Sequence, residues 1–324
     1  MKKRNEFSAG YEVSQMYTYR LGGCDQKVLI EGKTKDLPVV IFLHGGPGTP
    51  IPFNAGCRGL FPEFTDRFLM VYWDQLGCGI NNCELDENLK ISHFVTMAAD
   101  LCREVKRLFP KNKLLLFSTS WGSVLSAKLL EAKAPVDGVV ACGQITHDLL
   151  FNEPVKKALE SSRIPAAKLE LIRSIERQLI TQEDLKLLST SLQKYTDAYQ
   201  NRKGKNPPMW PVIRGLLSSP DYHIRDLKAV MVNGYTKNSA LFTSLFQELL
   251  RTDLRPVLRN TQIPYHMIQG DTDLVATTAF AKELAETADN PSLTCEIVQN
   301  AGHYPNMDTM ESVLRALISL ASRK

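Results

Sequence analysis

The sequence predicts an α/β protein with a mostly parallel central sheet, helices on both faces of that sheet and a helical segment inserted near the middle of the chain. In residues 1–144, short apolar runs alternate with helical patterns, which is typical of such a sheet. The alternation stops over residues 145–255, where the pattern is mostly helical, and it resumes afterwards. We therefore expect a core domain formed by residues 1–144 and 256–324, and a helical cap formed by residues 145–255.

Each short apolar run before residue 145 is interpreted as a buried strand. These runs are Val39–Leu43, Phe68–Trp73, Leu114–Phe117 and Val136–Cys142. From Phe94 to Leu108 apolar residues recur every three or four positions, which predicts a helix with its N-cap at Ser92. After the insertion we expect the strands Ile263–Gly270 and Leu293–Val298, a helix near Thr277–Thr287 and a closing helix after Asp308.

Composition excludes several classes of protein. The net charge is +4 over 324 residues, and no basic run with interleaved aromatic residues suggests nucleic-acid binding. No apolar stretch approaches the length of a membrane span, and the basic opening is not followed by the apolar segment of a signal peptide. The seven cysteines include no C-x-x-C pair, so we expect free thiols, a cytoplasmic location and no metal site. The oligomeric state is left open.

Positive charge is concentrated in the predicted cap. Residues 145–255 contain 17 Lys and Arg against 12 Asp and Glu, a net charge of +5. The remainder contains 22 against 23, a net charge of −1, and the two parts sum to +4. We interpret this excess as a solvated helical surface.

The strand Leu114–Phe117 runs directly into Ser118-Thr119-Ser120-Trp121-Gly122, and a helical pattern follows. A strand that turns sharply into a helix presents its middle residue on a strained elbow, and close packing requires small residues two positions before and after it. Ser120 occupies the middle position of this S-x-S-x-G form of the G-x-S-x-G pattern. Ser118, at the strand end, and Ser123, inside the helix where it would cap or face solvent, are the alternative serines.

A serine nucleophile needs a base that removes its proton and a carboxylate that orients the base. In this architecture the order along the chain is nucleophile, acid, histidine. Gly270-Asp271-Thr272-Asp273 follows one late strand, and Gly302-His303 follows the next. We favour Asp273 as the acid, with Asp271 as the alternative that would cap the loop backbone. His303 is favoured over the other five histidines because it follows a glycine directly after a strand.

A glycine-rich stretch, His44-Gly45-Gly46-Pro47-Gly48, directly follows the strand Val39–Leu43. Glycines at this place let backbone N–H groups face the oxyanion that develops during acyl transfer. The second donor is expected to be the backbone N–H of Trp121, the residue after the nucleophile. A phosphate-binding loop would need a lysine and a helix N-terminus, and the residues after Gly48 offer neither cleanly.

Taken together, these stretches resemble the proline iminopeptidase group of α/β-hydrolases. That family carries H-G-G-P-G, D-Q-R-G-x-G, G-x-S-W-G, G-x-x-D and G-H, which read here as HGGPG, DQLGCG (Asp74–Gly79), STSWG, GDTD and GH. The resemblance extends over about residues 38 to 310. It implies an α/β-hydrolase fold with a helical cap and a triad of Ser120, Asp273 and His303. It also implies an oxyanion hole formed by the N–H groups of Gly46 and Trp121.

The chain departs from this family at several positions. Leu76 stands where the family has arginine, so the DQLGCG loop is expected to be braced differently, and Ser118 stands for the first glycine of the elbow. Family members that release N-terminal proline hold its amine with cap carboxylates, one of them just after a tryptophan. Here Trp210 is followed by Pro211. The candidates for substrate contacts are Gly45, Glu153, Asp197, Trp210 and Glu248.

We therefore expect a serine hydrolase that acts by acyl transfer and needs no cofactor or metal. The resemblance implies release of an N-terminal residue, preferably proline, with a short peptide or other small molecule as substrate. A carboxylesterase, or another acyl hydrolase on the same scaffold, is the alternative. A non-catalytic ligand-binding protein of the same fold is the most distant interpretation.

Overall fold

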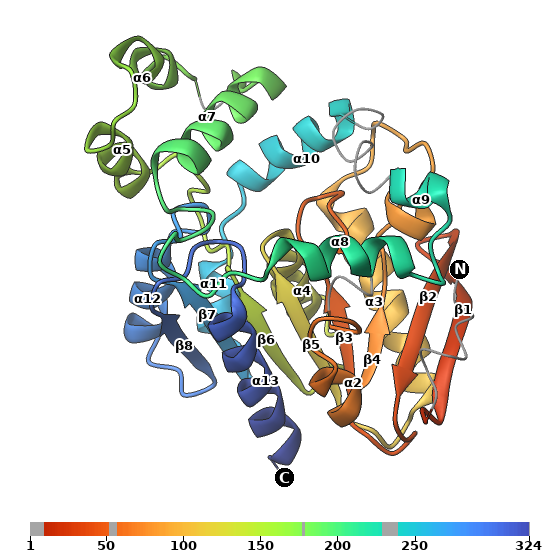
Figure 1. Cartoon of the computed structure of the whole chain (residues 1–324). Helices are drawn as coiled ribbons and strands as arrows, with labels where there is room; N and C mark the ends of the chain where they lie inside the picture. Colours follow the sequence, from red (N-terminus) through yellow and green to blue (C-terminus); the bar gives the residue numbers. More distant parts are fainter. Residues whose placement is uncertain (1–9, 52–56, 177–178, 229–238, 324) are drawn as a thin grey trace.

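The computed structural model describes residues 10–51, 57–176, 179–228 and 239–323. These residues form an eight-stranded sheet in the order β1-β2-β4-β3-β5-β6-β7-β8 (Figure 1). β2 pairs antiparallel with β1 and β4, whereas the remaining neighbours pair in parallel. The strands are β1 (Val13–Leu21), β2 (Cys24–Gly32), β3 (Val39–Leu43), β4 (Leu69–Tyr72), β5 (Leu114–Thr119), β6 (Gly138–Cys142), β7 (Tyr265–Gly270) and β8 (Leu293–Val298).

The strands from β3 to β8 confirm the six runs predicted from the sequence, but the β1–β2 hairpin was not predicted. Gly22 and Gly23 form its turn with φ angles of 57° and 84°. Two consecutive residues with positive φ match the twist of the flanking strands, which is why a Gly-Gly pair is a hairpin signal. The signal was therefore present in the sequence.

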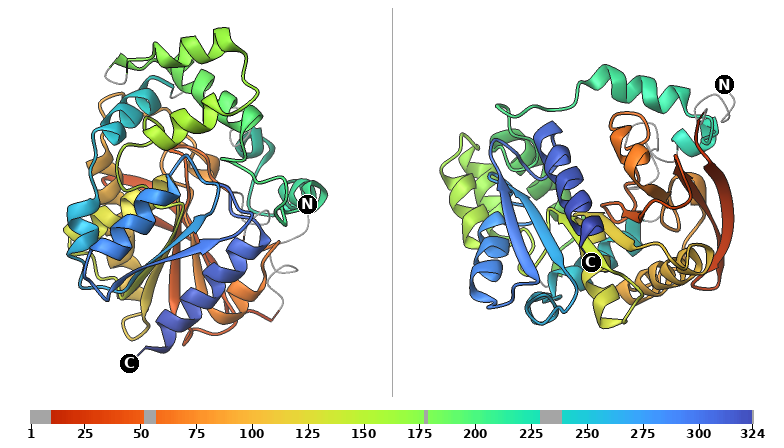
Figure 2. Two further views of the ribbon diagram at one scale, coloured as in Figure 1. Left: turned by 90° about the vertical axis from the view of Figure 1, so that its left-hand side faces the viewer. Right: turned by 90° about the horizontal axis from the view of Figure 1, so that it is seen from below.

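Successive side chains of β5 point into two different cores. Leu114 and Leu116 belong to the first core, and Leu115 and Phe117 belong to the second. The first face is covered by α3 (Ile91–Leu108), α4 (Trp121–Glu131), α11 (Arg255–Arg259) and α12 (Thr278–Thr287), and the second by α2 (Glu63–Arg67) and α13 (Met307–Ser322). Figure 2 shows these two helical layers on either side of the sheet.

The prediction that Ser92 caps α3 is wrong, because the helix begins at Ile91. The backbone N–H of Lys90 donates to Nδ1 of His93 (2.8 Å), and that of Ile91 donates to Oε2 of Glu248 (3.0 Å). The first N–H groups of a helix have no partner within the helix, so side chains from elsewhere can take the place of a local serine cap.

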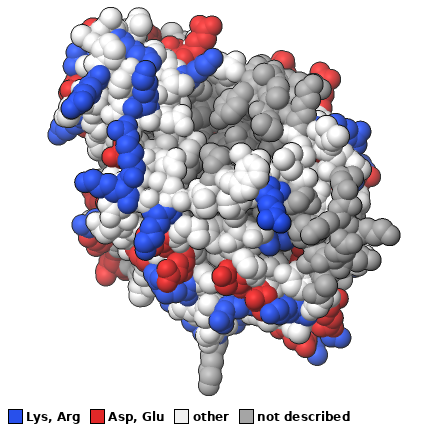
Figure 3. All heavy atoms as spheres, in the orientation of Figure 1, with Lys and Arg blue, Asp and Glu red and all other residues white. Residues whose placement is uncertain are grey.

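Between β6 and α11 the described residues form helices and no strand. These helices are α5 (Glu153–Glu160), α6 (Ala166–Arg173), α7 (Gln182–Tyr195), α8 (Met209–Ser218), α9 (Ile224–Lys228) and α10 (Ser239–Leu250). Figure 1 shows α5, α6, α7 and α10 grouped at the top of the view, on the side where the parallel strands end. In Figure 3, Lys and Arg side chains gather at the upper left of the molecule, where Figure 1 places α5, α6 and α7, in keeping with the charge excess of residues 145–255. A cap function for this segment stays a prediction.

Candidate active site

The strand-to-helix turn at Ser120 has a strained backbone. Ser120 has φ 50° and ψ −118°, a conformation that a residue with a side chain adopts only when its surroundings impose it. Its backbone N–H donates to the carbonyl of Cys142 at 2.9 Å, and α4 begins at the next residue. A Cβ atom on Gly122 would lie 2.0 Å from the carbonyl oxygen of Leu43. The second glycine of the elbow is therefore required because α4 packs directly on the end of β3.

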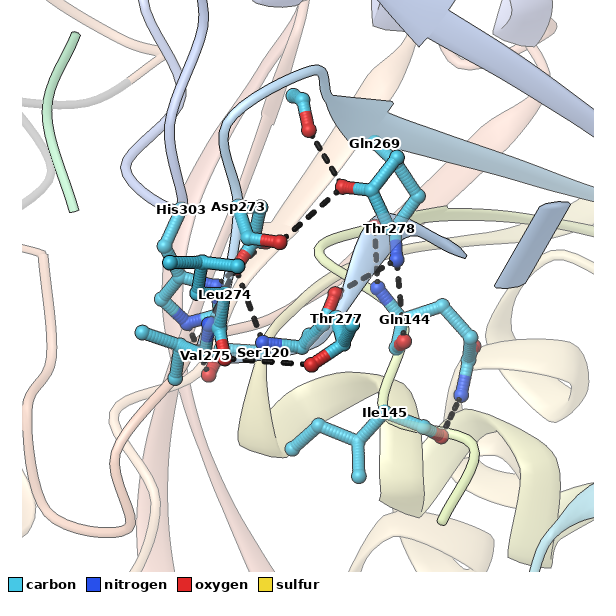
Figure 4. A network of polar contacts seen from close by, with 12 residues as sticks. Ser120, Gln144, Ile145, Gln269, Asp273, Leu274, Val275, Thr277, Thr278 and His303 are labelled. Carbon is cyan, nitrogen blue, oxygen red and sulfur yellow. Dashed lines mark hydrogen bonds and ion pairs between the residues drawn. The ribbon is translucent and has the colours of Figure 1, made fainter. Parts of the chain in front are cut away.

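The structure brings Ser120, His303 and Asp273 together (Figure 4). Nε2 of His303 lies 2.8 Å from Oγ of Ser120, and Nδ1 lies 2.8 Å from Oδ2 of Asp273. Serine comes from the end of β5, aspartate from the loop after β7 and histidine from the loop after β8. Parallel strands end at the same edge of a sheet, which is why three positions distant in sequence meet here.

Backbone donors hold the carboxylate of Asp273 in place. Its Oδ1 accepts hydrogen bonds from the backbone N–H groups of Val275 (2.8 Å) and Ala276 (2.9 Å), and its side chain is fully buried. Asp271 accepts instead from the backbone N–H of Ala301 at 3.0 Å. This loop-capping contact is the role expected for the alternative acid.

The two alternative serines lie away from the imidazole contact. The side chain of Ser118 points into the packing at the end of β5 and is fully buried, as expected. Ser123 is also fully buried, and its Oγ accepts a hydrogen bond from the backbone N–H of Ile145 at 3.1 Å. The expectation that Ser123 would cap the helix or face solvent is therefore wrong, because this hydroxyl holds the chain as it leaves β6.

Buried polar contacts join the glycine-rich loop to the elbow. Nε2 of His44 accepts from the backbone N–H of Gln75 (3.0 Å), and its Nδ1–H donates to the carbonyl of Gly45 (2.8 Å). Burial lowers the pKa of His44 to about 4, so this imidazole stays neutral. Gln75 also donates to the carbonyl of His44 (3.1 Å) and accepts from the indole N–H of Trp121 (2.8 Å). Sequence reasoning gave Gln75 no role, although it joins the two predicted parts of the oxyanion hole.

The DQLGCG loop is braced without the family's arginine. Leu76, which stands in place of that arginine, is buried in the first core. Asp74 accepts a hydrogen bond from the hydroxyl of Tyr222 (2.8 Å) and another from the backbone N–H of Ile80 (2.9 Å). The side chain of Asn81 donates to the carbonyl of Asp74 at 2.6 Å. Burial raises the pKa of Asp74 to about 7.

Two further residues that support His303 and the loop of Asp273 were not predicted from the sequence. Gly143, with φ 63°, lies so close to His303 that an added Cβ would be 3.1 Å from Cε1 of the imidazole. Gln269 is fully buried at the end of β7 and joins the loop after β6 to the loop that carries Asp273. It accepts from the backbone N–H of Gln144 (2.8 Å) and donates to the carbonyl of Ala276 (3.1 Å). The sequence signal for this role was a glutamine inside an otherwise apolar strand.

The candidates for substrate contacts are spread over the molecule. Gly45 lies against Ser120, since an added Cβ would be 3.3 Å from Cβ of Ser120. Glu153 is on the first turn of α5 with its side chain 69% exposed, and Trp210 on α8 is 72% exposed. Asp197 pairs with Nε of Arg202 at 3.6 Å. A role in substrate binding stays a prediction for each of them and for Glu248.

Comparison with known proteins agrees with this geometry. Residues 38–309 match the family model described as the alpha/beta hydrolase fold. This chain belongs to the α/β-hydrolase fold family. The match covers the strands, loops and helical segment that carry every residue of the candidate site. The prediction of an α/β-hydrolase enzyme is thereby confirmed, and so is its fold class.

Relatives of this α/β-hydrolase include peptidases. It is 23% identical over 308 residues to a probable aminopeptidase, YbaC, of Bacillus subtilis (strain 168), covering 91% of this chain and 92% of that protein. It is 34% identical over 130 residues to a proline iminopeptidase of Neisseria gonorrhoeae, covering 38% of this chain and 35% of that protein. The crystal structure of a proline iminopeptidase from Mycobacterium smegmatis superposes with a TM-score of 0.61 at 17% identity, covering 95% and 97% of the two chains. The resemblance to the proline iminopeptidase group is confirmed.

None of the helices in the described part of this α/β-hydrolase combines the length and the apolar character needed to cross a membrane.

Proposed function

We propose that this α/β-hydrolase is a serine hydrolase that acts by acyl transfer, with Ser120 as nucleophile, His303 as general base and Asp273 as the carboxylate that orients the base. The observation that carries the proposal is the chain of two 2.8 Å contacts from Ser120 through the imidazole to Asp273. An imidazole protonated on Nδ1 donates to Asp273, which leaves Nε2 free to accept the serine proton.

In this mechanism Oγ of Ser120 attacks a substrate carbonyl carbon while its proton moves to His303. His303 then gives that proton to the departing alcohol or amine, and water releases the acyl group by the same two steps. The N–H groups of Gly46 and Trp121 are the proposed donors to the oxyanion. The backbone N–H of Trp121 is suited to this role because Trp121 is the first residue of α4, where N–H groups lack an intrahelical partner. Each group in this proposed mechanism, apart from substrate and water, is a side chain or a backbone N–H of the protein.

The names of the relatives suggest peptides with a free N-terminal residue, but the carboxylates of the helical segment favour a different substrate class. Glu153 lies 3.7 Å from the ammonium of Lys156, Asp197 pairs with Arg202, and Glu248 accepts from the N–H of Ile91. Each of these three carboxylates thus has a basic or N–H partner within 3.7 Å. With a net charge of +5 over residues 145–255, the segment suits neutral or anionic acyl groups better than a cationic amine.

Hydrolysis of prolyl-β-naphthylamide, its N-acetylated form and p-nitrophenyl acetate would separate these classes. We expect turnover of the acetate ester, with loss of that turnover in Ser120→Ala. Cleavage of the free-amine amide alone would instead support an iminopeptidase, and stepwise replacement of the three carboxylates would then locate the amine site. Equal activity of the parent protein and Ser120→Ala on all three compounds would refute the serine mechanism.

A further inference from the structure

A short stretch of the helical segment lies directly on the loop that carries His303. We call residues 196–206, which follow α7, the connector. The backbone N–H of His303 donates to the carbonyl of Ala198 at 2.8 Å, and that of Tyr304 donates to the carbonyl of Tyr199 at 2.8 Å. Two hydrogen bonds from consecutive residues fix both the position and the direction of the backbone that bears the imidazole.

The connector also reaches the loop that carries Asp273. The hydroxyl of Thr272, the residue before the acid, lies 2.9 Å from the carbonyl oxygens of both Asp197 and Ala301, so its one proton is shared between the connector and the base loop. Further along, the backbone N–H of Met307 donates to the carbonyl of Lys205 at 3.0 Å. The connector therefore spans the acid loop and the base loop, and it joins them to the helical segment.

The connector lies so close to Gly302, the residue before His303, that only a glycine fits at this position. A Cβ on Gly302 would lie 2.7 Å from the carbonyl carbon of Tyr199 and 2.9 Å from the carbonyl oxygen of Asp197. Backbone atoms cannot swing aside as a flexible side chain can. The glycine of the G-H pair is thus required because another segment of backbone lies on it.

The ring of Tyr199 contacts the imidazole itself. The centroids of Tyr199 and His303 are 6.0 Å apart with the rings at 90°, and the ring of Tyr304 is tilted at 50° to that of Tyr199 with the centroids 5.3 Å apart. Aromatic rings at this distance and angle attract one another through their quadrupoles. Since Asp273 contacts one ring nitrogen and Ser120 the other, the tyrosine holds the imidazole at a place that neither of them reaches.

We propose that the connector positions the base, and that Tyr199 is a positioning residue that keeps the imidazole aligned between Asp273 and Ser120. This inference rests on the proposed role of His303 as the base. Misplacing a catalytic group by about 1 Å costs on the order of 100-fold in rate. Tyr199→Ala should therefore lower kcat about 10- to 100-fold and leave KM within about 2-fold, whereas Tyr199→Phe, which keeps the ring, should retain kcat within about 3-fold.

The test uses diisopropyl fluorophosphate, a reagent too small to depend on an extended substrate pocket. An Oγ–P bond forms at Ser120, the P–F bond breaks, fluoride departs and the serine proton moves to His303. The second-order rate constant of inactivation would be measured for the parent, Tyr199→Ala, Tyr199→Phe and Gly302→Ala. We expect Tyr199→Ala and Gly302→Ala to react about 10- to 100-fold more slowly than the parent, and Tyr199→Phe to react like it.

Tyr195→Ala is the matched control, because this tyrosine is also in the helical segment but its ring lies under the ammonium groups of Lys168 and Lys194. It should react at the parent rate. If Tyr199→Ala were inactivated as fast as the parent and changed only KM, the ring would be a pocket wall and the inference would be wrong. Gly302→Ala keeps the ring, so it tests the connector even if Tyr199→Ala fails to fold. A parent protein whose Ser120 is not modified would refute the proposed function itself.

Discussion

Replacement of Asp74 by asparagine should change how the stability of the protein depends on pH. Asp74 is 2% exposed, and the pKa of its carboxyl group is raised from 3.8 to about 7, chiefly by burial. Hydrogen bonds from Ile80 and Tyr222 oppose this rise, and the charge of Asp226 adds to it. Between about pH 4 and 7 the folded protein thus holds a proton at Asp74 that the unfolded chain has already released.

The direction and size of the effect follow from this difference. Below about pH 4 the group is protonated in both states and has no effect on stability. Between about pH 4 and 7 the unfolded carboxyl ionises first, so the free energy of unfolding falls as pH rises, and above about pH 7 the loss is complete. The pKa difference is about 3, and each unit corresponds to about 1.4 kcal/mol, so the total loss is about 4 kcal/mol.

Urea denaturation of the parent and of Asp74→Asn from pH 4 to 8 would measure this loss. An asparagine oxygen can accept the same two hydrogen bonds but does not ionise, so the free energy of unfolding of the variant, minus that of the parent, should grow by about 4 kcal/mol over this range. Asp66→Asn is the matched control. That side chain is 41% exposed and pairs with Lys33 at 3.0 Å, so its effect should stay below about 1 kcal/mol. Parallel pH profiles for the parent and Asp74→Asn would refute the reasoning.

Three further predictions concern the elbow, the triad and the helical segment. Asp273→Asn should lower kcat for p-nitrophenyl acetate by about 10³- to 10⁴-fold without unfolding the protein. An amide cannot both accept the two backbone N–H bonds and accept the N–H of the imidazole that orients it. A kcat within about tenfold of the parent value would speak against the orienting role. Gly122→Ala should lower the free energy of unfolding by about 1–3 kcal/mol, because the new methyl group meets the carbonyl at the end of β3; an unchanged urea midpoint would contradict this packing. Glu248→Ala should cost about 1 kcal/mol by removing the acceptor at the N-terminus of α3, and Glu248→Gln less. Neither Glu248 variant should change KM for p-nitrophenyl acetate, and an increase in KM would place Glu248 in the substrate site instead.

The convergence of Ser120, Asp273 and His303 could be predicted from the sequence because it depends on local order and on the topology of a parallel sheet. The strand-to-helix turn at Ser120 is visible within ten residues. Asp273 and His303 each follow a strand, and parallel strands bring such loops to one edge. The distances and the backbone donors to Asp273 add detail to that placement without changing it.

Contacts between the helical segment and the core could not be predicted in this way. Arg58 forms buried ion pairs with Glu31 of β2 and with Asp221, which precedes α9. Tyr199 meets His303, and Glu248 meets the N-terminus of α3. These pairs come from segments far apart in the chain, and helix periodicity indicates which face is apolar but not which distant group a polar side chain will meet.

Whether Ser120 is an activated nucleophile can be tested by locating a fluorophosphonate adduct by mass spectrometry. We expect a single adduct on the peptide that contains Ser120, formed only by folded protein and lost in Ser120→Ala. Ser118→Ala and Ser123→Ala should both retain it. An adduct on another residue, or none on folded protein that still hydrolyses p-nitrophenyl acetate, would contradict the account.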